Sequence, residues 1–174
     1  MINAIDDDGD RPLHIAAEFG NSEVVQWILD KPELKADINE KNGNDLTPLF
    51  LVCLKGYVGA EGIGSKTDSV KIKRLRIVRM LVEKGADVNY TRAVVGLTPL
   101  HWAAYNDDAE LCRFLLANKA IQKESTAGSM PVDIAGFTGH KLVVKVFMEH
   151  VAKKVDALVG QGPGAEDAVE VDLN

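Results

Sequence analysis

The chain has 174 residues, of which 46% are hydrophobic and 26% are charged, and its formal net charge at pH 7 is −6. This composition is that of an ordinary globular protein, and no apolar run approaches the roughly 18 residues that a membrane-spanning helix needs. The N-terminal residues are rich in Asp and lack a basic region before an apolar core, which argues against a secretory signal. We therefore expect a protein of the cytoplasm or the nucleus.

Charge is distributed unevenly along the chain. Residues 1–50 carry 4 Lys/Arg against 11 Asp/Glu, whereas residues 51–90 carry 8 against 4. Such a polarised surface can orient a charged partner, although screening at physiological salt restricts the effect to about 8 Å. We therefore expect a partner whose basic end lies near the N-terminal part.

Four proline-centred segments recur along the chain and each opens an apolar stretch: Arg11–His14, Thr47–Phe50, Thr98–His101 and Met130–Asp133. The prolines are separated by 36, 51 and 32 residues, so one interval contains an insertion. A Thr before Pro supplies a helix N-cap, and Pro fits the first helical position because it needs no amide hydrogen there. Each segment therefore predicts the start of a helix.

Apolar residues follow each start at helical spacing. We expect the small pairs Ala16-Ala17 and Ala103-Ala104 to let neighbouring first helices approach closely. Second-helix residues predicted to be buried are Val24, Val25, Ile28, Leu29, Leu111, Leu115 and Leu116. Gly20, Gly56 and Gly139 are expected to end the first helices in the left-handed conformation, with Asn106-Asp107 in that place in the third unit.

These units resemble the ankyrin repeat, whose signature is T-P-L-H-x-A with a period near 33 residues. The resemblance covers about residues 2–151 and is clearest over Gly96–Ala104, which follows the hairpin-like leader Gly85–Asn89. It implies an all-α solenoid of helix-turn-helix pairs joined by β-hairpin loops. The repeats would span about 6–39, 43–89 with an insertion at about 57–73, 95–123 and 127–150; a helical extension at 151–159 would complete a single domain, 2–159, before an acidic tail, 160–174.

Two departures from the family pattern fall on the end repeats, where Arg11 and Met130 replace the capping Thr and Asp133 replaces His. Residues 2–6 look like a hairpin that follows an absent repeat. The chain is therefore either cut from a longer array or begins naturally with a repeat that caps itself. The resemblance also implies that His14 and His101 brace the hairpins.

The resemblance implies a non-catalytic module that binds a partner protein or peptide through hairpin tips and the exposed side of the first helices. The partner would have a basic end and apolar anchors. For Trp102 two interpretations stay open, a contact residue beside Tyr105 or a filler of the seam between repeats. The candidate partner-binding residues are Asp8, Asp10, Glu18, Phe19, Leu46, Leu54, Lys55, Val94, Val95, Leu97, Trp102, Tyr105, Asn106 and Phe137.

The insertion offers an alternative site of a different class. Its glycine-rich part predicts a loop, after which Asp68 or Ser69 caps a second helix lengthened at its start. Basic side chains at a helix start are unfavourable for the helix dipole, so they indicate either a phosphate, nucleic-acid or acidic partner, or simply a solvated surface. The residues concerned are Lys66, Lys71, Lys73, Arg74 and Arg76.

No catalytic or metal-binding motif is present, and we expect neither an enzyme nor a cofactor or metal. Cys53 and Cys112 lie on apolar helical faces and are predicted to be small buried thiols. We expect a monomer without nucleic acid or a membrane span. The tail is interpreted as disordered or docked, and a third hypothesis makes the chain the targeting part of a larger enzyme or channel.

Overall fold

The computed structural model describes residues 4–34, 36–54, 58–59, 62–63 and 68–159. Over these residues the chain forms eight α-helices in four consecutive pairs. A short 3-10 helix, Pro32–Leu34, follows α2, and two two-residue strands, β1 (Val58–Gly59) and β2 (Gly62–Ile63), pair antiparallel after α3. The helix pairs are α1 (Pro12–Glu18) with α2 (Ser22–Leu29), α3 (Pro48–Leu54) with α4 (Asp68–Glu83), α5 (Pro99–Tyr105) with α6 (Ala109–Ala117), and α7 (Pro131–Phe137) with α8 (Lys141–Val159).

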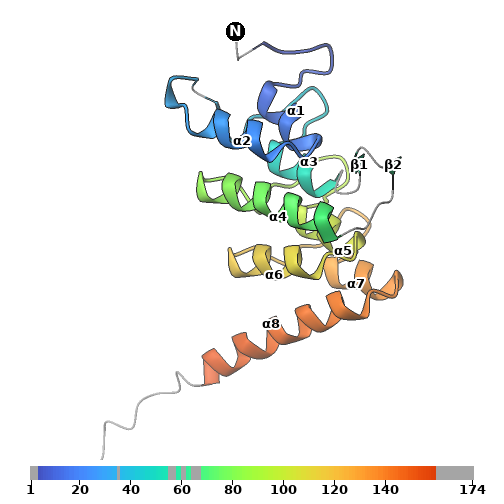
Figure 1. The fold of residues 1–174 in the computed structure, drawn as a ribbon. Helices are drawn as coiled ribbons and strands as arrows, with labels where there is room; N and C mark the ends of the chain where they lie inside the picture. Colours follow the sequence, from blue (N-terminus) through green and yellow to red (C-terminus); the bar gives the residue numbers. More distant parts are fainter. Residues whose placement is uncertain (1–3, 35, 55–57, 60–61, 64–67, 160–174) are drawn as a thin grey trace, which may run out of the picture.

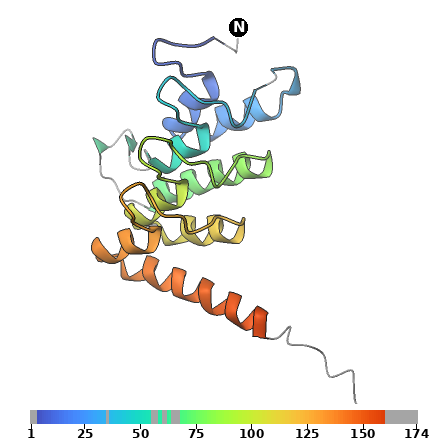
Figure 2. The same ribbon diagram turned by 180° about the vertical axis from the view of Figure 1, so that it is seen from behind.

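The pairs stack into an elongated array with two columns of helices. The first helices α1, α3, α5 and α7 contact one another in order (Figure 1). In the second column α2 contacts α4 and α6 contacts α8, and α4 meets α6 where the Arg79 guanidinium lies over the Phe114 ring. Seen from behind, the loops that precede the first helices follow one another along the array (Figure 2). The predicted all-α solenoid is thereby confirmed.

Side chains near the starts of α1, α5 and α7 bind the backbone that enters each of these helices. His14 Nδ1 accepts a hydrogen bond from the Arg11 amide at 3.2 Å, and His101 Nδ1 accepts one from the Thr98 amide at 3.0 Å. Asp133 does the same for the Met130 amide at 2.9 Å, although its residue type departs from the family pattern. In α7 a carboxylate therefore takes the place of the imidazole as the hydrogen-bond acceptor at the start of the helix.

The two histidines also connect neighbouring repeats. Because a backbone amide can only donate, Nδ1 is the acceptor in both rings and the proton lies on Nε2. Nε2 then donates to the Glu40 carbonyl from His14, at 2.9 Å, and to the Ser129 carbonyl from His101, at 3.2 Å. The expected bracing of hairpins is confirmed, and burial lowers the pKa of His101 below its ordinary value.

Asparagine side chains form a second link that repeats along the array. Asn39 accepts from the Asp87 amide at 2.8 Å and donates to the Gly85 carbonyl at 3.1 Å. Asn89, fifty residues later, bonds the Ile121 amide and the Lys119 carbonyl in the same way. Each amide side chain thus satisfies two backbone groups of the following repeat, which fixes the offset between repeats.

Three of the four helix pairs are joined by three residues each, 19–21, 106–108 and 138–140. Gly20, Asp107 and Gly139 have positive φ there, of 69°, 55° and 77°, as predicted for the ends of the first helices. In the second pair thirteen residues, 55–67, separate α3 from α4, and Gly56 lies outside the described residues. The structure starts α4 at Asp68, so the basic segment after it is helical.

One core cluster runs the length of the array, and a smaller cluster of Leu46, Phe50 and Leu51 lies beside it. Cys53 and Cys112 are buried in the main cluster, as predicted, and burial raises the pKa of the Cys53 thiol to about 12. The expectation for Val24 is wrong, since it is exposed. Its neighbour Val25 already faces the core, and successive helical residues point about 100° apart.

Candidate functional site

The last residues of the four first helices occupy equivalent positions and line one side of the array. Each lies six residues after the proline that opens its helix, and the stacked first helices bring them into a row. Along the chain the row changes from a carboxylate to aromatic rings, and Tyr105 and Phe137 are 54% and 86% exposed. We call these four residues the first-helix row: Glu18, Leu54, Tyr105 and Phe137.

The third member of this row, Tyr105, belongs to an aromatic pair. The rings of Trp102 and Tyr105 meet edge to face, with centroids 5.7 Å apart. Trp102 is partly buried and packs against both core clusters, whereas Tyr105 is exposed. The structure therefore places Trp102 partly in the seam between repeats, beneath the more accessible Tyr105.

The hairpin before α5 contributes one open apolar side chain. Val94 is 78% exposed, whereas Val95 is half-buried and its carbonyl accepts a hydrogen bond from the Thr126 amide at 3.2 Å. Leu97 is half-buried and packs against the smaller cluster. Val94 is thus the hairpin residue best placed to touch another molecule.

Three residues expected to contact a partner are buried instead. Asp10 accepts a hydrogen bond from Asn42 Nδ2 at 2.7 Å, and Asn106 Nδ2 donates to the Cys53 carbonyl at 3.0 Å. Leu46 belongs to the smaller core cluster. Asp10, Leu46 and Leu97 all lie two residues before a helix-opening proline, a position whose side chain points inward in each hairpin. Aligning the units at proline could have shown that this position is structural.

The other N-terminal candidates are more open. Phe19 is 68% exposed, Asp8 is exposed and Glu18 is half-buried. Lys55 lies outside the described residues. The acidic first hairpin is stabilised by Asp6, whose carboxylate accepts from the Asp8 and Asp10 amides at 3.1 and 2.8 Å.

A polar and aromatic cluster between the second and third hairpins was missed from the sequence. The Tyr90 hydroxyl donates to the Asp45 carbonyl at 2.7 Å, and its ring meets Phe50 edge to face. Lys41 Nζ lies 5.0 Å from the Tyr90 ring centroid and 2.9 Å from the Asp45 carboxylate. Their contact raises the pKa of Lys41 and lowers the pKa of Asp45. The sequence offered one signal for this cluster, since Tyr90 directly follows the hairpin leader that ends at Asn89.

Two of the five residues of the alternative basic site form contacts inside the protein instead of a surface site. Arg74 is buried and pairs with Asp108 at 3.2 Å, so its inclusion in a surface site is wrong. Lys71 is half-buried and donates to the Asp107 carbonyl at 3.1 Å. The basic charge near the start of α4 therefore has an internal cause, because it binds the turn that precedes α6. Lys66 lies outside the described residues.

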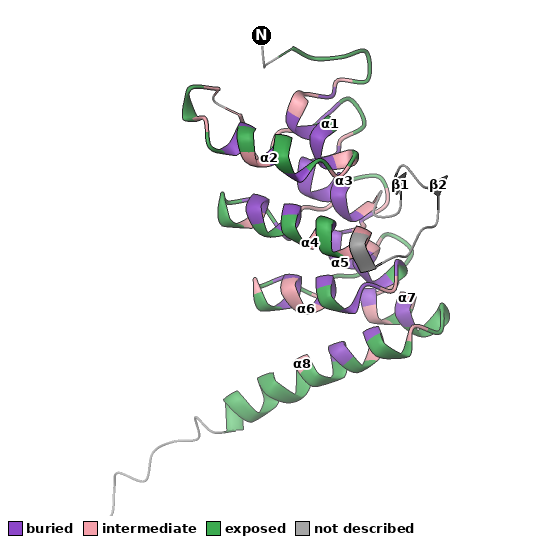
Figure 3. Ribbon diagram, in the orientation of Figure 1, coloured by how far each residue is buried: buried purple, intermediate pink, exposed green. Residues whose placement is uncertain are grey.

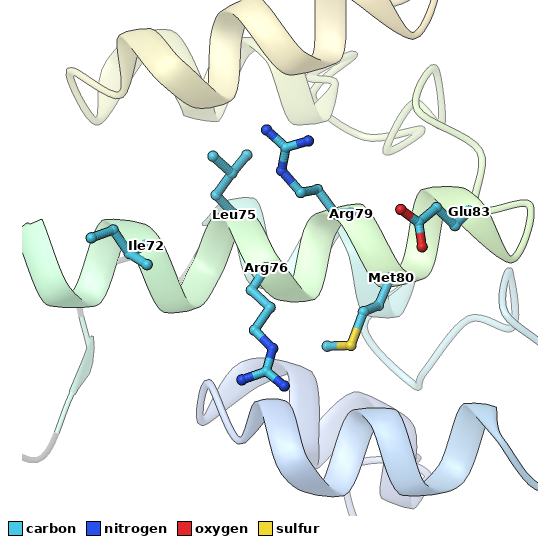
Figure 4. Close-up of a pocket in the computed structure, with 6 residues that line it drawn as sticks. All are labelled: Ile72, Leu75, Arg76, Arg79, Met80 and Glu83. Carbon is cyan, nitrogen blue, oxygen red and sulfur yellow. The ribbon is translucent and has the colours of Figure 1, made fainter.

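Lys73 and Arg76 remain exposed on the outer side of α4. Arg76 lines a shallow hollow of about 380 Å³ in which Arg76 and Met80 point toward α2 while Leu75 and Arg79 point toward α6 (Figure 4). The Arg79 guanidinium also lies 4.7 Å from the centroid of the Phe114 ring. The full lining is Ile72, Leu75, Arg76, Arg79, Met80 and Glu83.

Within the described ranges, no three His, Cys, Asp or Glu side chains are grouped closely enough to hold a metal ion. No helix in this part of the chain is both long and apolar enough to cross a bilayer.

Comparisons with known proteins give one consistent family. Residues 68–157 match the profile of ankyrin repeats in three copies, and residues 2–51 match a second ankyrin-repeat profile. A probable 26S proteasome regulatory subunit, p28, from Saccharomyces cerevisiae is 30% identical over 164 residues, which cover 93% of this chain and 64% of that protein.

Two further relatives are similar over shorter shares of their own length. ANK repeat-containing protein nipk-1 from Caenorhabditis elegans is 32% identical over 118 residues, which are 68% of this chain and 18% of that protein. The nuclear factor NF-kappa-B p105 subunit from Gallus gallus is 27% identical over 149 residues, which are 83% of this chain and 13% of that protein. The chain thus spans less than two thirds of the length of each of these relatives.

Proposed function

The chain belongs to the ankyrin-repeat family, and from this premise we propose that it is a non-catalytic module that binds a partner protein through the first-helix row and the hairpin beside it. The observation that carries the proposal is the pair of exposed aromatic side chains, Tyr105 and Phe137, at equivalent positions in the last two members of the row. Exposed aromatic side chains on a rigid support are typical of binding hot spots, because they bury a large area at little cost in conformational entropy.

The binding surface proposed from the structure is narrower than that expected from the sequence. We omit Asp10, Leu46 and Asn106 because they are buried. Val94 lies on the hairpin just before α5, and Phe19 and Asp8 extend the surface toward the acidic end. This arrangement supports a partner with apolar anchors for the third and fourth repeats and basic groups for the first.

Similarity to the yeast protein along 93% of the chain supports the 26S proteasome as the first setting in which to look for that partner. We propose a cytoplasmic or nuclear protein that acts as a monomer, with residues 2–159 as one domain. Purified 26S proteasomes are the first binding probe.

The test compares the wild-type chain, a Tyr105→Ala/Phe137→Ala variant and an Ile72→Ala control as baits. Ile72 is 67% exposed but lies on the outer side of α4, so it controls for the loss of any exposed apolar side chain. We expect each removal from the row to weaken binding by about 1 kcal/mol or more, a fivefold loss of affinity, measured by titration calorimetry. Equal affinity in the double variant and the wild type would remove the row from the interface.

A further inference from the structure

The last helix carries an apolar stripe that the rest of the described structure does not cover. Its first half packs on the array through Val143, Val146 and Phe147, whereas residues 151–159 are all exposed (Figure 3). Spacings of three, four and three residues place the members of the stripe on one side of the helix. They are between 49% and 74% exposed: Met148, Val151, Val155 and Leu158.

This stripe lies on the outer side of the last described repeat. Within the described residues no element packs on that side of α8, whereas the apolar faces of the other repeats are buried by a neighbour. Several large apolar side chains exposed in a continuous line mark a surface that another segment covers. In addition, a nine-residue helical segment without tertiary contacts is marginal in water.

Cations border the stripe on both sides. At 100° per residue, Lys141 and Lys145 fall along one edge of the stripe together with the carboxylate of Asp156, and Lys154 falls along the other edge. Lys145 has one exposed ion pair, with Glu149 at 3.9 Å, which contributes little in water. A segment that covers the stripe would therefore gain from carboxylates next to its apolar side chains.

We propose that the chain's own last ten residues, 165–174, fold back along α8 and cover this stripe. The segment has four carboxylates and no Lys or Arg, and its apolar residues include Val169, Val171 and Leu173. Five residues, 160–164, with the sequence Gly-Gln-Gly-Pro-Gly, lie between it and the end of α8. Five residues are enough for the turn between two antiparallel elements.

The tail segment is long enough to cover the exposed part of α8. From Met148 to Val159 the helix rises by about 16 Å, at 1.5 Å per residue. Ten residues span about 15 Å as a helix and about 33 Å when extended. Because the segment is tethered, its effective concentration reaches the millimolar range, so individually weak contacts suffice.

A second copy of α8 is the competing occupant. Pairing two stripes would bring the lysine borders of one copy toward those of the other, whereas the tail brings carboxylates to them. The charges therefore favour the tail, and the tail's cover would close the C-terminal end of the array independently of the first-helix row.

Amide hydrogen exchange on the full chain tests the proposal. The variant Val169→Ser/Val171→Ser/Leu173→Ser keeps the length and charge of the tail but removes its apolar side chains. We expect amides of residues 151–159 to exchange at least tenfold faster in this variant, while amides of α6 keep their rates. The control Ile72→Ser, which removes an exposed apolar side chain from α4, should leave both regions unchanged.

Two outcomes would overturn the proposal. One is the same exchange rate at residues 151–159 in the tail variant and the wild type. The other is protection that rises with protein concentration together with a mass of two chains by light scattering, since that result assigns the stripe to a second copy.

Discussion

The ion pair between Arg74 and Asp108 gives the sharpest test of how neighbouring repeats are held together. Arg74 lies in α4 and Asp108 caps α6, where its other oxygen accepts the Leu111 amide at 3.1 Å. Both side chains are 3% exposed. Replacing Arg74 with Met keeps a long apolar side chain but leaves a buried carboxylate without its cation.

We expect Arg74→Met to lower the free energy of unfolding by about 3 to 5 kcal/mol, the usual cost of leaving one partner of a buried pair uncompensated. For a chain of this length, that corresponds to a fall in melting temperature of about 6 to 20 °C. Urea unfolding followed by circular dichroism at pH 7 measures the change. Arg76→Met, an exposed cation half a turn away, is the control and should change stability by no more than about 0.5 kcal/mol.

The double variant Arg74→Met/Asp108→Asn separates charge from capping. Asn removes the buried charge and can still accept the Leu111 amide, so the double variant should be about 2 kcal/mol more stable than Arg74→Met alone. The reasoning is refuted if Arg74→Met costs under about 1 kcal/mol, or if the two substitutions destabilise additively.

Three further predictions follow from groups described above. Gly96→Ala should lower the free energy of unfolding, measured in urea, by about 2 kcal/mol or more, because φ is +65° and an added Cβ would lie 2.6 Å from a backbone nitrogen of the next hairpin. Gly128→Ala is the control and should lower it less, because φ is +75° there but the added Cβ meets open space. Equal losses in the two variants would contradict the steric argument. Because burial lowers the pKa of His101 from 6.5, the unfolded chain binds the proton more readily, and stability is lost as pH falls below about 6.5. His101→Gln can retain the capping contact without titrating, so urea midpoints from pH 7.5 to 5.5 should fall less steeply; an unchanged slope counts against this role. Burial raises the pKa of Cys53 to about 12 and also raises that of Cys112, so neither thiol should react with a disulfide reagent at pH 8 until urea unfolds the chain; rapid labelling of the native protein would contradict their burial.

The helix starts and the histidine contacts could be predicted from sequence because they depend on neighbours in the chain. A proline at the first helical position and a capping side chain two residues after it specify a helix start locally. The pairing of Arg74 with Asp108 could not be predicted in this way, since the partners lie 34 residues apart and meet only after two repeats have stacked.

The candidate site was less predictable for a related reason. Successive side chains at a hairpin tip point alternately inward and outward. Leu46 and Val94 are both apolar residues of such tips, yet Leu46 is buried and Val94 is exposed. Which one points outward depends on the register of the hairpin against its neighbour, a property that composition does not carry. Tyr90 was missed because its role arises from Asp45 and Lys41, which belong to the preceding hairpin.

The connection between α3 and α4 is ten residues longer than the other three, yet α3 and α4 contact each other and each contacts its counterpart in the first repeat. Solenoid stability is approximately a sum of repeat and nearest-neighbour terms, and the array keeps these terms whatever the length of that connection. The same stretch is therefore where a reporter domain could be inserted with the stacked repeats left intact.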